Sequence, residues 1–424
     1  MTQEANIQPG NSFQANEPDI GAMDGALGRL LSSLPARANI PLRLVLWNGK
    51  SVDLGPGARV SLQVKNAKAL SYLLRPSLDN LAEAYVNGHF DVGGSVSDIV
   101  DVAMRLAAEG NAGPGKFARL FNPVRHNKAL DKSSIAHHYD VSNAFYQCWL
   151  DPRMVYSCAY YPGGAESLAD AQLAKLDHVL NKLMLKKDEL LLDIGCGWGA
   201  LAIRAAQRYG ARVVGVTLSE NQYLLARERV AEAGLNSRVD IRLLDYRDLK
   251  PADGPFDKIT SIGMFEHVGL KHLGAYFTKI HSLLKDGGLV MNHGITSTDP
   301  GSGSTPLGAG EFIDKYVFPN GELPHISLAL QEMQIGGLEA LDVECLRRHY
   351  ARTLWQWSQN FEAQSEALRS LVDDKTWRIW RIYLAGCAHA FEQNWVSLYQ
   401  VLACKAGAPE RLNSTPWSRA YMYR

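Results

Sequence analysis

The sequence predicts an α/β fold in which a doubly wound, Rossmann-like parallel sheet binds a ligand at the carboxyl ends of its strands. Five apolar segments after residue 189 have the composition of buried strands, and the segments between them repeat with helical periodicity. The first strand runs into a glycine cluster, Gly195, Gly197 and Gly199, that opens a helical pattern. Strands that alternate with helices form a parallel sheet, and its ligand lies beyond the strand tips.

The five strands are expected in the order 190–195, 211–217, 239–245, 256–263 and 287–294. Ser219 precedes the second helix of this unit and is expected to cap it. The C-terminal third carries Trp355, Trp357, Trp377, Trp380, Phe391, Trp395 and Tyr399 at helical spacings. We expect these residues to lie on helices that pack against the sheet, most of them as core and some along a tunnel for a ligand.

Four segments are expected along the chain. Residues 1–20 are polar and are expected to be disordered, and residues 21–110 form a smaller mixed α+β domain. That domain begins with an amphipathic helix over 23–34, and an Asn48-Gly49 turn then joins two strands in a hairpin. Residues 111–132 read as a basic linker rich in glycine and proline, and 133–424 form the catalytic domain.

Charge and cysteine content narrow the class of protein. Lys plus Arg and Asp plus Glu both number 44 in 424 residues, so no overall field favours a nucleic-acid partner. The six cysteines show no C-x-x-C pair, which indicates free thiols in a reducing cytoplasm. The first twenty residues lack a signal-peptide pattern, and no segment has the length and apolarity of a membrane span.

The glycine loop fits two cofactors. Gly195, Gly197 and Ala200 satisfy the dinucleotide pattern G-x-G-x-x-G/A, whereas Asp193 with the three glycines resembles the first motif of S-adenosylmethionine (AdoMet) methyltransferases. A dinucleotide enzyme needs an acidic residue at the second strand tip, but that tip is Thr217-Leu218. The third tip is acidic at Asp245, where a carboxylate can accept the adenine amino group. This pattern favours AdoMet, and Asp193 is expected to brace the turn and face the ammonium group of the cofactor.

Glu266 follows the fourth expected strand, and His293 lies at the end of the fifth. Either residue alone is more often structural than functional. Together they place a carboxylate and an imidazole over one pocket, which suits the handling of a proton or the binding of a small oxygen-rich ion. Cys158 is not expected to act as a nucleophile, because a thiolate beside a sulfonium would be alkylated. No metal site is expected.

Six segments in order closely resemble the cyclopropane-fatty-acyl-phospholipid synthase family, relatives of the mycolic acid cyclopropane synthases. They are HHYDVSNAFYQCWLDPRMVYSCAYY, LLDIGCGWGALAIRAA, VVGVTLSENQ, LLDYRD, SIGMFEHVG and DKYVFPNGELP. The resemblance covers roughly residues 135–402 and, more weakly, the N-terminal domain, which it marks as lipid-binding-like. It implies a class I AdoMet methyltransferase fold. One departure is Gly294, where relatives often carry threonine.

The resemblance also implies an activity and its residues. In that family the AdoMet methyl group goes to a cis double bond of a phospholipid acyl chain, and bound bicarbonate removes the proton whose loss closes the cyclopropane. Bicarbonate is implied to be held by Cys158 (largely through its backbone), Glu266, His293, Ile295 (through its backbone) and Tyr350. AdoMet is implied to lie against Tyr156, Ser157, Gly195, Gly197, Thr217, Leu218, Gln222 and Asp245.

The resemblance further suggests peripheral contact with the inner face of the membrane and a homodimer. Four alternatives stay open: methylation of an alkene without ring closure, methylation of an amine, a lipid-binding protein without activity, and a nicotinamide oxidoreductase. A carbocation on the acyl chain would be stabilised by aromatic rings that attract a cation without attacking it. The candidates for this role are Tyr139, Tyr156, Tyr160, Tyr161, Phe265 and Tyr316. The segment 296–310, rich in glycine and serine, is a candidate lid.

Overall fold

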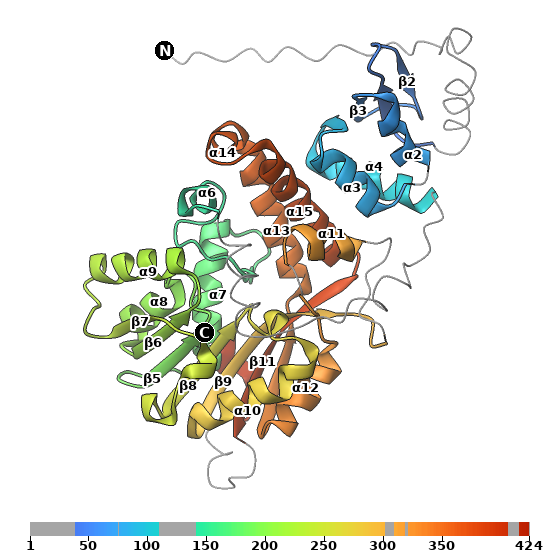
Figure 1. The fold of residues 1–424 in the computed structure, drawn as a ribbon. Coiled ribbons are helices and arrows are strands. Elements are labelled where there is room, and N and C mark those ends of the chain that lie inside the picture. Colours follow the sequence, from blue (N-terminus) through green and yellow to red (C-terminus); the bar gives the residue numbers. More distant parts are fainter. Residues whose placement is uncertain are drawn as a thin grey trace. The chain divides into compact units, whose positions relative to one another are not determined.

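The computed structural model describes residues 39–74, 76–109, 141–301, 309–318, 321–405 and 415–423. Two compact units make up the chain, Met1–Ala112 and Gly113–Arg424 (Figure 1). The segment expected to be disordered (1–20), the helix expected at 23–34 and the linker expected at 111–132 lie outside the described residues. Residues 302–308 of the candidate lid, 296–310, also lie outside them.

The described part of the first unit is a four-stranded sheet with helices. The strands are β1 (Leu42–Val45), β2 (Ser51–Asp53), β3 (Val60–Val64) and β4 (Phe90–Gly93), in the order β2-β1-β3-β4. Helices α2 (Ser71–Leu74), α3 (Leu78–Val86) and α4 (Val96–Glu109) complete it. The expected hairpin is confirmed, since β1 and β2 pair antiparallel around Gly49, whose φ is +82°. The Asn48 side chain accepts a hydrogen bond from the Lys50 N–H at 3.0 Å, which stabilises this turn.

A seven-stranded sheet forms the centre of the second unit, in the order β10-β11-β9-β8-β5-β6-β7. The five expected strands are confirmed as β5 (Leu190–Ile194), β6 (Arg212–Thr217), β7 (Val239–Leu243), β8 (Phe256–Ile262) and β9 (Leu284–Ser297). Neighbours among these five pair in parallel, so their carboxyl ends lie along one edge. The strand order reverses beside β5, which is where a doubly wound sheet binds its ligand.

Two strands of this sheet were not expected from the sequence. β10 (Leu338–Cys345) pairs with β11 (Val396–Lys405), and β11 lies antiparallel between β10 and β9. Tyr399 therefore lies on a strand and Trp395 directly precedes it, so their assignment to helices was wrong. A buried strand is apolar on both faces, and periodicity alone cannot distinguish it from a buried helix.

Helices cover both faces of the sheet, as Figure 1 shows. On one side lie α7 (Leu168–Lys182), α8 (Ala200–Tyr209) and α9 (Glu220–Glu232), and on the other lie α10 (Leu273–Leu283) and α12 (Ile326–Ile335). Each side buries its own apolar cluster against the strands.

The remaining helices are α6 (Asn143–Gln147), α11 (Ala309–Tyr316), α13 (Arg347–Ala363), α14 (Ser365–Leu371) and α15 (Asp374–Glu392), of which α13 packs along α15. These C-terminal helices confirm the expected helical addition. Among the residues that the structure describes, no helix is long and apolar enough to cross a membrane.

Candidate active site

A cavity opens at the carboxyl ends of the parallel strands, above β5 and β6. Eight of the nine residues expected to bind the cofactor line it, namely Tyr156, Ser157, Asp193, Gly195, Gly197, Thr217, Leu218 and Gln222. The ninth, Asp245, is not among the lining residues, although its neighbours Leu244 and Tyr246 are. The Asp245 carboxylate instead forms an ion pair with Arg247, at 2.6 Å from its Nη2.

The glycine loop adopts a backbone that other residues avoid. Gly195, Gly197 and Gly199 have φ of +76°, +55° and +81°, and Gly199 forms the N-cap of α8. A Cβ on Gly195 would lie 2.6 Å from the Cγ of Met264, so this position has no room for a side chain. The loop thus brings bare backbone to the mouth of the cavity at a helix N-terminus.

Thr217 and Gln222 shape the side of the cavity formed by β6 and α9. The Thr217 hydroxyl donates a hydrogen bond to Gln222 Oε1 at 2.8 Å and accepts one from the Ser219 N–H at 3.2 Å. Ser219 is the N-cap of α9, as expected, and its hydroxyl accepts a hydrogen bond from the Gln222 N–H. The neutral tip of β6 is therefore a rigid hydrogen-bonded corner.

Asp193 is the fourth residue of β5 and is 3% exposed. Its Oδ1 accepts a hydrogen bond from the Thr260 hydroxyl of β8 at 2.8 Å. Burial raises the pKa of this carboxyl to about 6, and the Thr260 hydrogen bond opposes the rise. Asp193 thus provides a negative charge within the cavity at neutral pH.

The Tyr156-Ser157 segment is held by two buried side chains of α7. Gln172 Nε2 donates to the carbonyl oxygens of Val155 and Ser157, at 3.2 and 2.9 Å. Lys175 Nζ donates to the Ser157 hydroxyl at 3.0 Å, and Lys175 itself lines the cavity. The sequence analysis missed Lys175. Its signal was a lysine on the apolar stripe of α7, between Ala171 and Val179.

Glu266 lies in a short 3₁₀ turn directly after β8 and is 7% exposed. Its Oε1 accepts a hydrogen bond from the backbone N–H of Ile295 at 2.6 Å. Ile295 lies on β9 two residues beyond His293, the last residue of β9 that pairs with β8. The Oε2 of Glu266 is buried and has no hydrogen-bond partner among the described residues. Burial raises the pKa of Glu266 to about 7, although the Ile295 N–H favours the ionised form.

His293 lies on β9 opposite Gln400 of β11 and is 1% exposed. Gln400 Nε2 lies 3.1 Å from Nδ1 of the ring, whereas the buried Nε2 of His293 has no partner in the part of the chain described here. Burial, followed by the charge on Lys175, lowers the pKa of His293 well below its usual range, so the ring is neutral. If the Gln400 amide donates to Nδ1, then Nε2 carries the proton and can donate.

Cys158 and Tyr350 complete the expected catalytic set from the α13 side. The Cys158 thiol is fully buried and lies 3.9 Å from the carbonyl oxygen of Leu346, the N-cap of α13. The Tyr350 N–H donates to the same carbonyl, and the Leu346 N–H donates to Leu398 of β11, the register partner of Ile295. Burial raises the pKa of the Cys158 thiol far above its usual range, so it stays protonated and does not act as a nucleophile.

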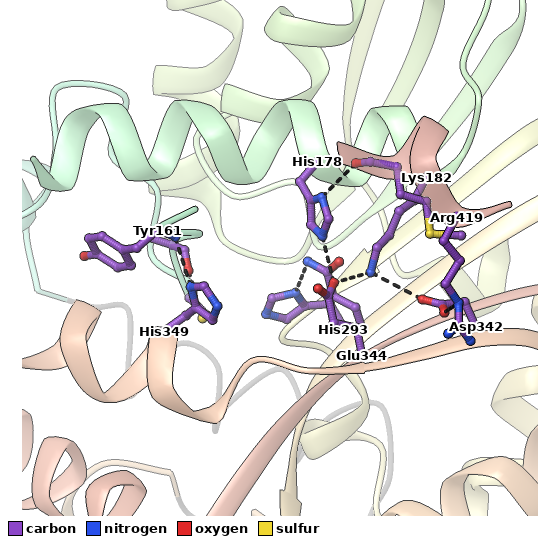
Figure 2. Close-up of polar contacts among 12 residues, drawn as sticks. Tyr161, His178, Lys182, His293, Asp342, Glu344, His349 and Arg419 are labelled. Carbon is purple, nitrogen blue, oxygen red and sulfur yellow. Dashed lines mark hydrogen bonds and ion pairs between the residues drawn. The ribbon is translucent and has the colours of Figure 1, made fainter. Parts of the chain in front are cut away.

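A network of buried charges lies beside His293 (Figure 2). Glu344 of β10 contacts His178 at 2.7 Å and Lys182 at 2.5 Å, and both partners project from α7. Burial opposes ionisation of Glu344, but the hydrogen bond from His178 and the charge on Lys182 lower its pKa to about 2. Asp342 joins Lys182 to Arg419 near the C-terminus. This network ties α7 to the edge of the sheet behind the site.

The aromatic candidates fall into different environments. Tyr156 lines the cavity, with its ring centroid 5.2 Å from that of Trp357. Tyr160 is stacked between His178 and His349 at 4.1 and 4.9 Å. Tyr139 lies outside the described residues. Tyr161, whose N–H donates to His349, and Tyr316 of α11 do not line the cavity.

The exceptional glycine of β9 is explained by packing. A Cβ on Gly294 would lie 1.7 Å from Cε1 of Phe265, whose ring fills that space. Gly294 points to the face of the sheet opposite His293, because neighbouring residues of a strand alternate. Glycine in place of threonine at position 294 therefore makes room for the Phe265 ring and does not change the face of the sheet that carries His293.

Among the described residues, no cluster of three or more His, Cys, Asp or Glu side chains could hold a metal ion. The described residues provide a cavity with a glycine loop at the strand tips and, outside the residues that line this cavity, a buried carboxylate at Glu266 and a neutral imidazole at His293 of β9. Such a set can bind a nucleoside-like ligand beside a small ion that accepts one hydrogen bond and donates another.

Comparison with known proteins gives consistent results. A family model described as mycolic acid cyclopropane synthetase matches residues 126–401, and a domain of unknown function matches residues 30–110. The chain is 46% identical to a "Probable fatty acid methyltransferase" of Pseudomonas putida, over 93% of this chain and all of that protein. It is 34% identical to the cyclopropane-fatty-acyl-phospholipid synthase of Escherichia coli K12, over 91% of this chain and 95% of the relative.

The structural comparison points to the same fold. The crystal structure of mycolic acid cyclopropane synthase CmaA1 complexed with SAH and CTAB matches with a TM-score of 0.61 and 34% sequence identity. The match covers 65% of this chain and 98% of that one. The second unit therefore has the class I AdoMet methyltransferase fold expected from the sequence.

Proposed function

Because the chain belongs to the mycolic acid cyclopropane synthetase family, we propose that it forms cyclopropane fatty acids on phospholipids. In this reaction a methylene from AdoMet is added to the cis double bond of an unsaturated acyl chain. The methyl transfer would leave a carbocation on the acyl chain, and Glu266 and His293 would hold a bicarbonate whose basic oxygen is available for the proton lost on ring closure. When bound, AdoMet supplies an electrophilic methyl group and bicarbonate supplies a basic oxygen.

The cavity fits AdoMet. The space against Gly195 and Gly197 is kept open by backbone that excludes side chains, and Asp193 gives a buried negative charge for the ligand's ammonium group. Thr217 and Gln222 offer oxygen and amide groups for a ribose. In support, a structural neighbour with 34% identity is described as complexed with SAH. Asp245, held by Arg247, is proposed at the adenine end next to the lining residues Leu244 and Tyr246.

The single observation that carries the bicarbonate proposal is a pair of buried polar atoms without partners in the described structure, Glu266 Oε2 and His293 Nε2. Such atoms are costly to bury and mark a place for a polar ligand. Bicarbonate matches them, because its hydroxyl can donate to a carboxylate while its other oxygens accept from a neutral imidazole. Cys158 and Tyr350 are proposed to close the far side of this pocket.

Ile295 has a modified role in this proposal. It was expected to hold bicarbonate through its backbone, but its N–H donates to Glu266 Oε1 at 2.6 Å. We therefore assign Ile295 to orienting Glu266, which leaves Oε2 for the ligand. Glu266 has a pKa of about 7, so it accepts the ligand hydroxyl in the upper part of the physiological pH range.

The chain must also align the double bond and exclude water, because an isolated alkene is a weak nucleophile. Positive charge on the acyl chain is stabilised by aromatic faces that cannot attack it. Tyr156 is proposed for this role, since it lines the cavity and its ring meets those of Trp149 and Trp357, at 5.5 and 5.2 Å. The buried aromatic residues of α13 and α15 extend this apolar surface.

The phospholipid substrate is proposed from relatives. The Escherichia coli relative is named a cyclopropane-fatty-acyl-phospholipid synthase, and the match includes most of this chain. We propose a cytoplasmic protein that contacts the inner face of the membrane peripherally, with the first unit as the lipid-binding-like domain. A homodimer is part of the same proposal.

A second candidate is methylation of the acyl chain without ring closure. The relative with 46% identity carries the name fatty acid methyltransferase, and a second relative, at 33%, is the tuberculostearic acid methyltransferase UfaA1 of Mycobacterium tuberculosis. The unpartnered atoms of Glu266 and His293 favour a reaction that loses a proton to bicarbonate over methylation of an amine, and the product mass separates the ring from a methyl branch.

The test is mass spectrometry of phospholipids carrying a cis-unsaturated chain. The purified protein is incubated with them, AdoMet with a trideuterated methyl group, and bicarbonate. Ring closure removes one deuterium from that methyl group, so the product keeps two, whereas a methyl branch formed by loss of a proton from the acyl chain keeps all three. A methylene branch would also keep two, and its double bond distinguishes it from the ring by NMR. Glu266→Gln should lose the product, and Glu228→Gln on the exposed surface of α9 should not. Full activity of Glu266→Gln, or no dependence on bicarbonate, would refute the bicarbonate assignment.

A further inference from the structure

Lys175 is a buried cation that the proposed reaction does not yet use. It projects from α7, is 2% exposed and lines the same cavity as the glycine loop. Its Nζ donates one hydrogen bond, to the Ser157 hydroxyl at 3.0 Å, and forms no ion pair with any described carboxylate. Two of its three N–H bonds thus have no partner among the described residues.

An unpaired buried charge is unusual because desolvation disfavours it. Other buried lysines of this unit follow the usual rule: Lys182 contacts Glu344 at 2.5 Å, and Lys258 lies 3.9 Å from Glu189. A buried lysine that faces a cavity, with no described carboxylate within ion-pair distance, is suited to an anionic ligand that binds there.

Asp193 lines the same cavity and carries the opposite charge. Lys175 and Asp193 do not form an ion pair with each other, so each can meet a different group of one ligand. An α-amino acid presents an ammonium and a carboxylate on one carbon atom. The two side chains match that pair of charges.

We propose that Lys175 binds the α-carboxylate of the amino-acid part of AdoMet, opposite Asp193, which meets its ammonium group. The proposal rests on the proposed function and deepens it, because it assigns the contact that distinguishes AdoMet from other adenosine compounds. Ser157 orients the Lys175 ammonium through its hydroxyl.

The electrostatics are consistent with this assignment. Burial lowers the pKa of Lys175 to about 8, and the nearby Asp151 and Asp193 carboxyls limit the fall. At pH 7 Lys175 is therefore mostly protonated in the free protein. A bound carboxylate would raise its pKa again, so affinity for the ligand should weaken as pH rises above 8.

The experiment measures binding by calorimetry and uses two probes, S-adenosylhomocysteine (SAH) and decarboxylated SAH. The second probe keeps the adenosine and the ammonium group and lacks only the carboxylate. Wild type is expected to bind SAH about 10- to 100-fold more tightly, the range of a hydrogen bond between charged groups. Lys175→Met should bind the two probes equally, with the affinity that wild type shows for decarboxylated SAH.

Lys258→Met is the matched control, since Lys258 is also buried but lies near the amino end of β8, away from the cavity. It should keep the wild-type preference for SAH. Lys175→Met should melt no lower than wild type without ligand, because it removes a buried unpaired charge.

If Lys175→Met loses affinity for both probes equally, Lys175 has a purely structural role through Ser157 and the proposal is overturned. Unchanged affinity of Lys175→Met for SAH would also overturn the proposal. Wild type alone gives a test that does not depend on a folded variant: equal binding of SAH and decarboxylated SAH overturns the carboxylate contact. If wild type binds neither probe, the proposed function fails together with the inference. If wild type binds SAH and the variant shows no preference change, only the inference fails.

Discussion

Replacing Glu266 by glutamine should make the protein without ligand more stable at high pH, although it should abolish the reaction. Glu266 is buried, and burial raises its pKa from an ordinary value of 4.5 to about 7. Each pKa unit corresponds to about 1.4 kcal/mol, so ionised Glu266 costs the folded state about 3 kcal/mol relative to the unfolded chain. Glutamine has almost the same shape, can still accept the Ile295 N–H and cannot ionise.

The sign of the pH dependence follows from proton binding. Between pH 4.5 and about 7 the folded protein holds the Glu266 proton more firmly than the unfolded chain does. The wild-type free energy of unfolding therefore falls through this window, relative to that of Glu266→Gln. The two proteins should be about equally stable at pH 4.5, and the variant should be more stable by up to about 3 kcal/mol at pH 8.

The assay is urea denaturation followed by tryptophan fluorescence, at several pH values in buffer free of bicarbonate. Glu344→Gln gives a control of opposite sign, because His178 and Lys182 lower the pKa of Glu344 to about 2. That variant should be less stable than wild type at neutral pH. The reasoning about Glu266 is refuted if the difference between wild type and Glu266→Gln does not change with pH, or if Glu266→Gln is the less stable protein at pH 8.

Three further results are expected. Gly294→Ala should lower the free energy of unfolding by about 1–3 kcal/mol in urea titrations, because its Cβ would overlap the Phe265 ring; a change below about 0.5 kcal/mol would contradict the packing argument. Lys182→Met should cost about 3 kcal/mol or more, since it leaves Glu344 without its ammonium partner, and a melting temperature equal to wild type would argue against this. Cys158→Ala should keep the rate of ring formation within about tenfold of the wild-type rate, because the thiol is protonated and does not act as a nucleophile. For the same reason iodoacetamide should not alkylate Cys158 in the folded wild-type protein at pH 8, as measured by peptide mass spectrometry.

The sequence by itself determined the parallel part of the sheet and the edge of that sheet at which the cavity opens. The strands β5 to β9 and the glycine loop follow from local patterns, because apolar runs, glycines with positive φ and helix starts depend on neighbours along the chain. Glu266 and His293 were also expected near the ends of neighbouring strands, and they lie just after β8 and on β9; that they share one pocket stays a prediction. Eight of the nine expected cofactor residues line the cavity for the same reason.

Only the tertiary structure decided which partners these residues have. β11 enters the sheet between β9 and β10 and brings Gln400 to His293 from 107 positions away, and no local pattern encodes that contact. Likewise Lys175 reads as one polar residue in an apolar stripe until the fold places it at the cavity, where no described carboxylate lies within ion-pair distance of it. Burial and charge pairing are sums over neighbours brought together by folding, so the protonation states of Glu266 and Lys175 belong to the folded chain and not to its sequence motifs.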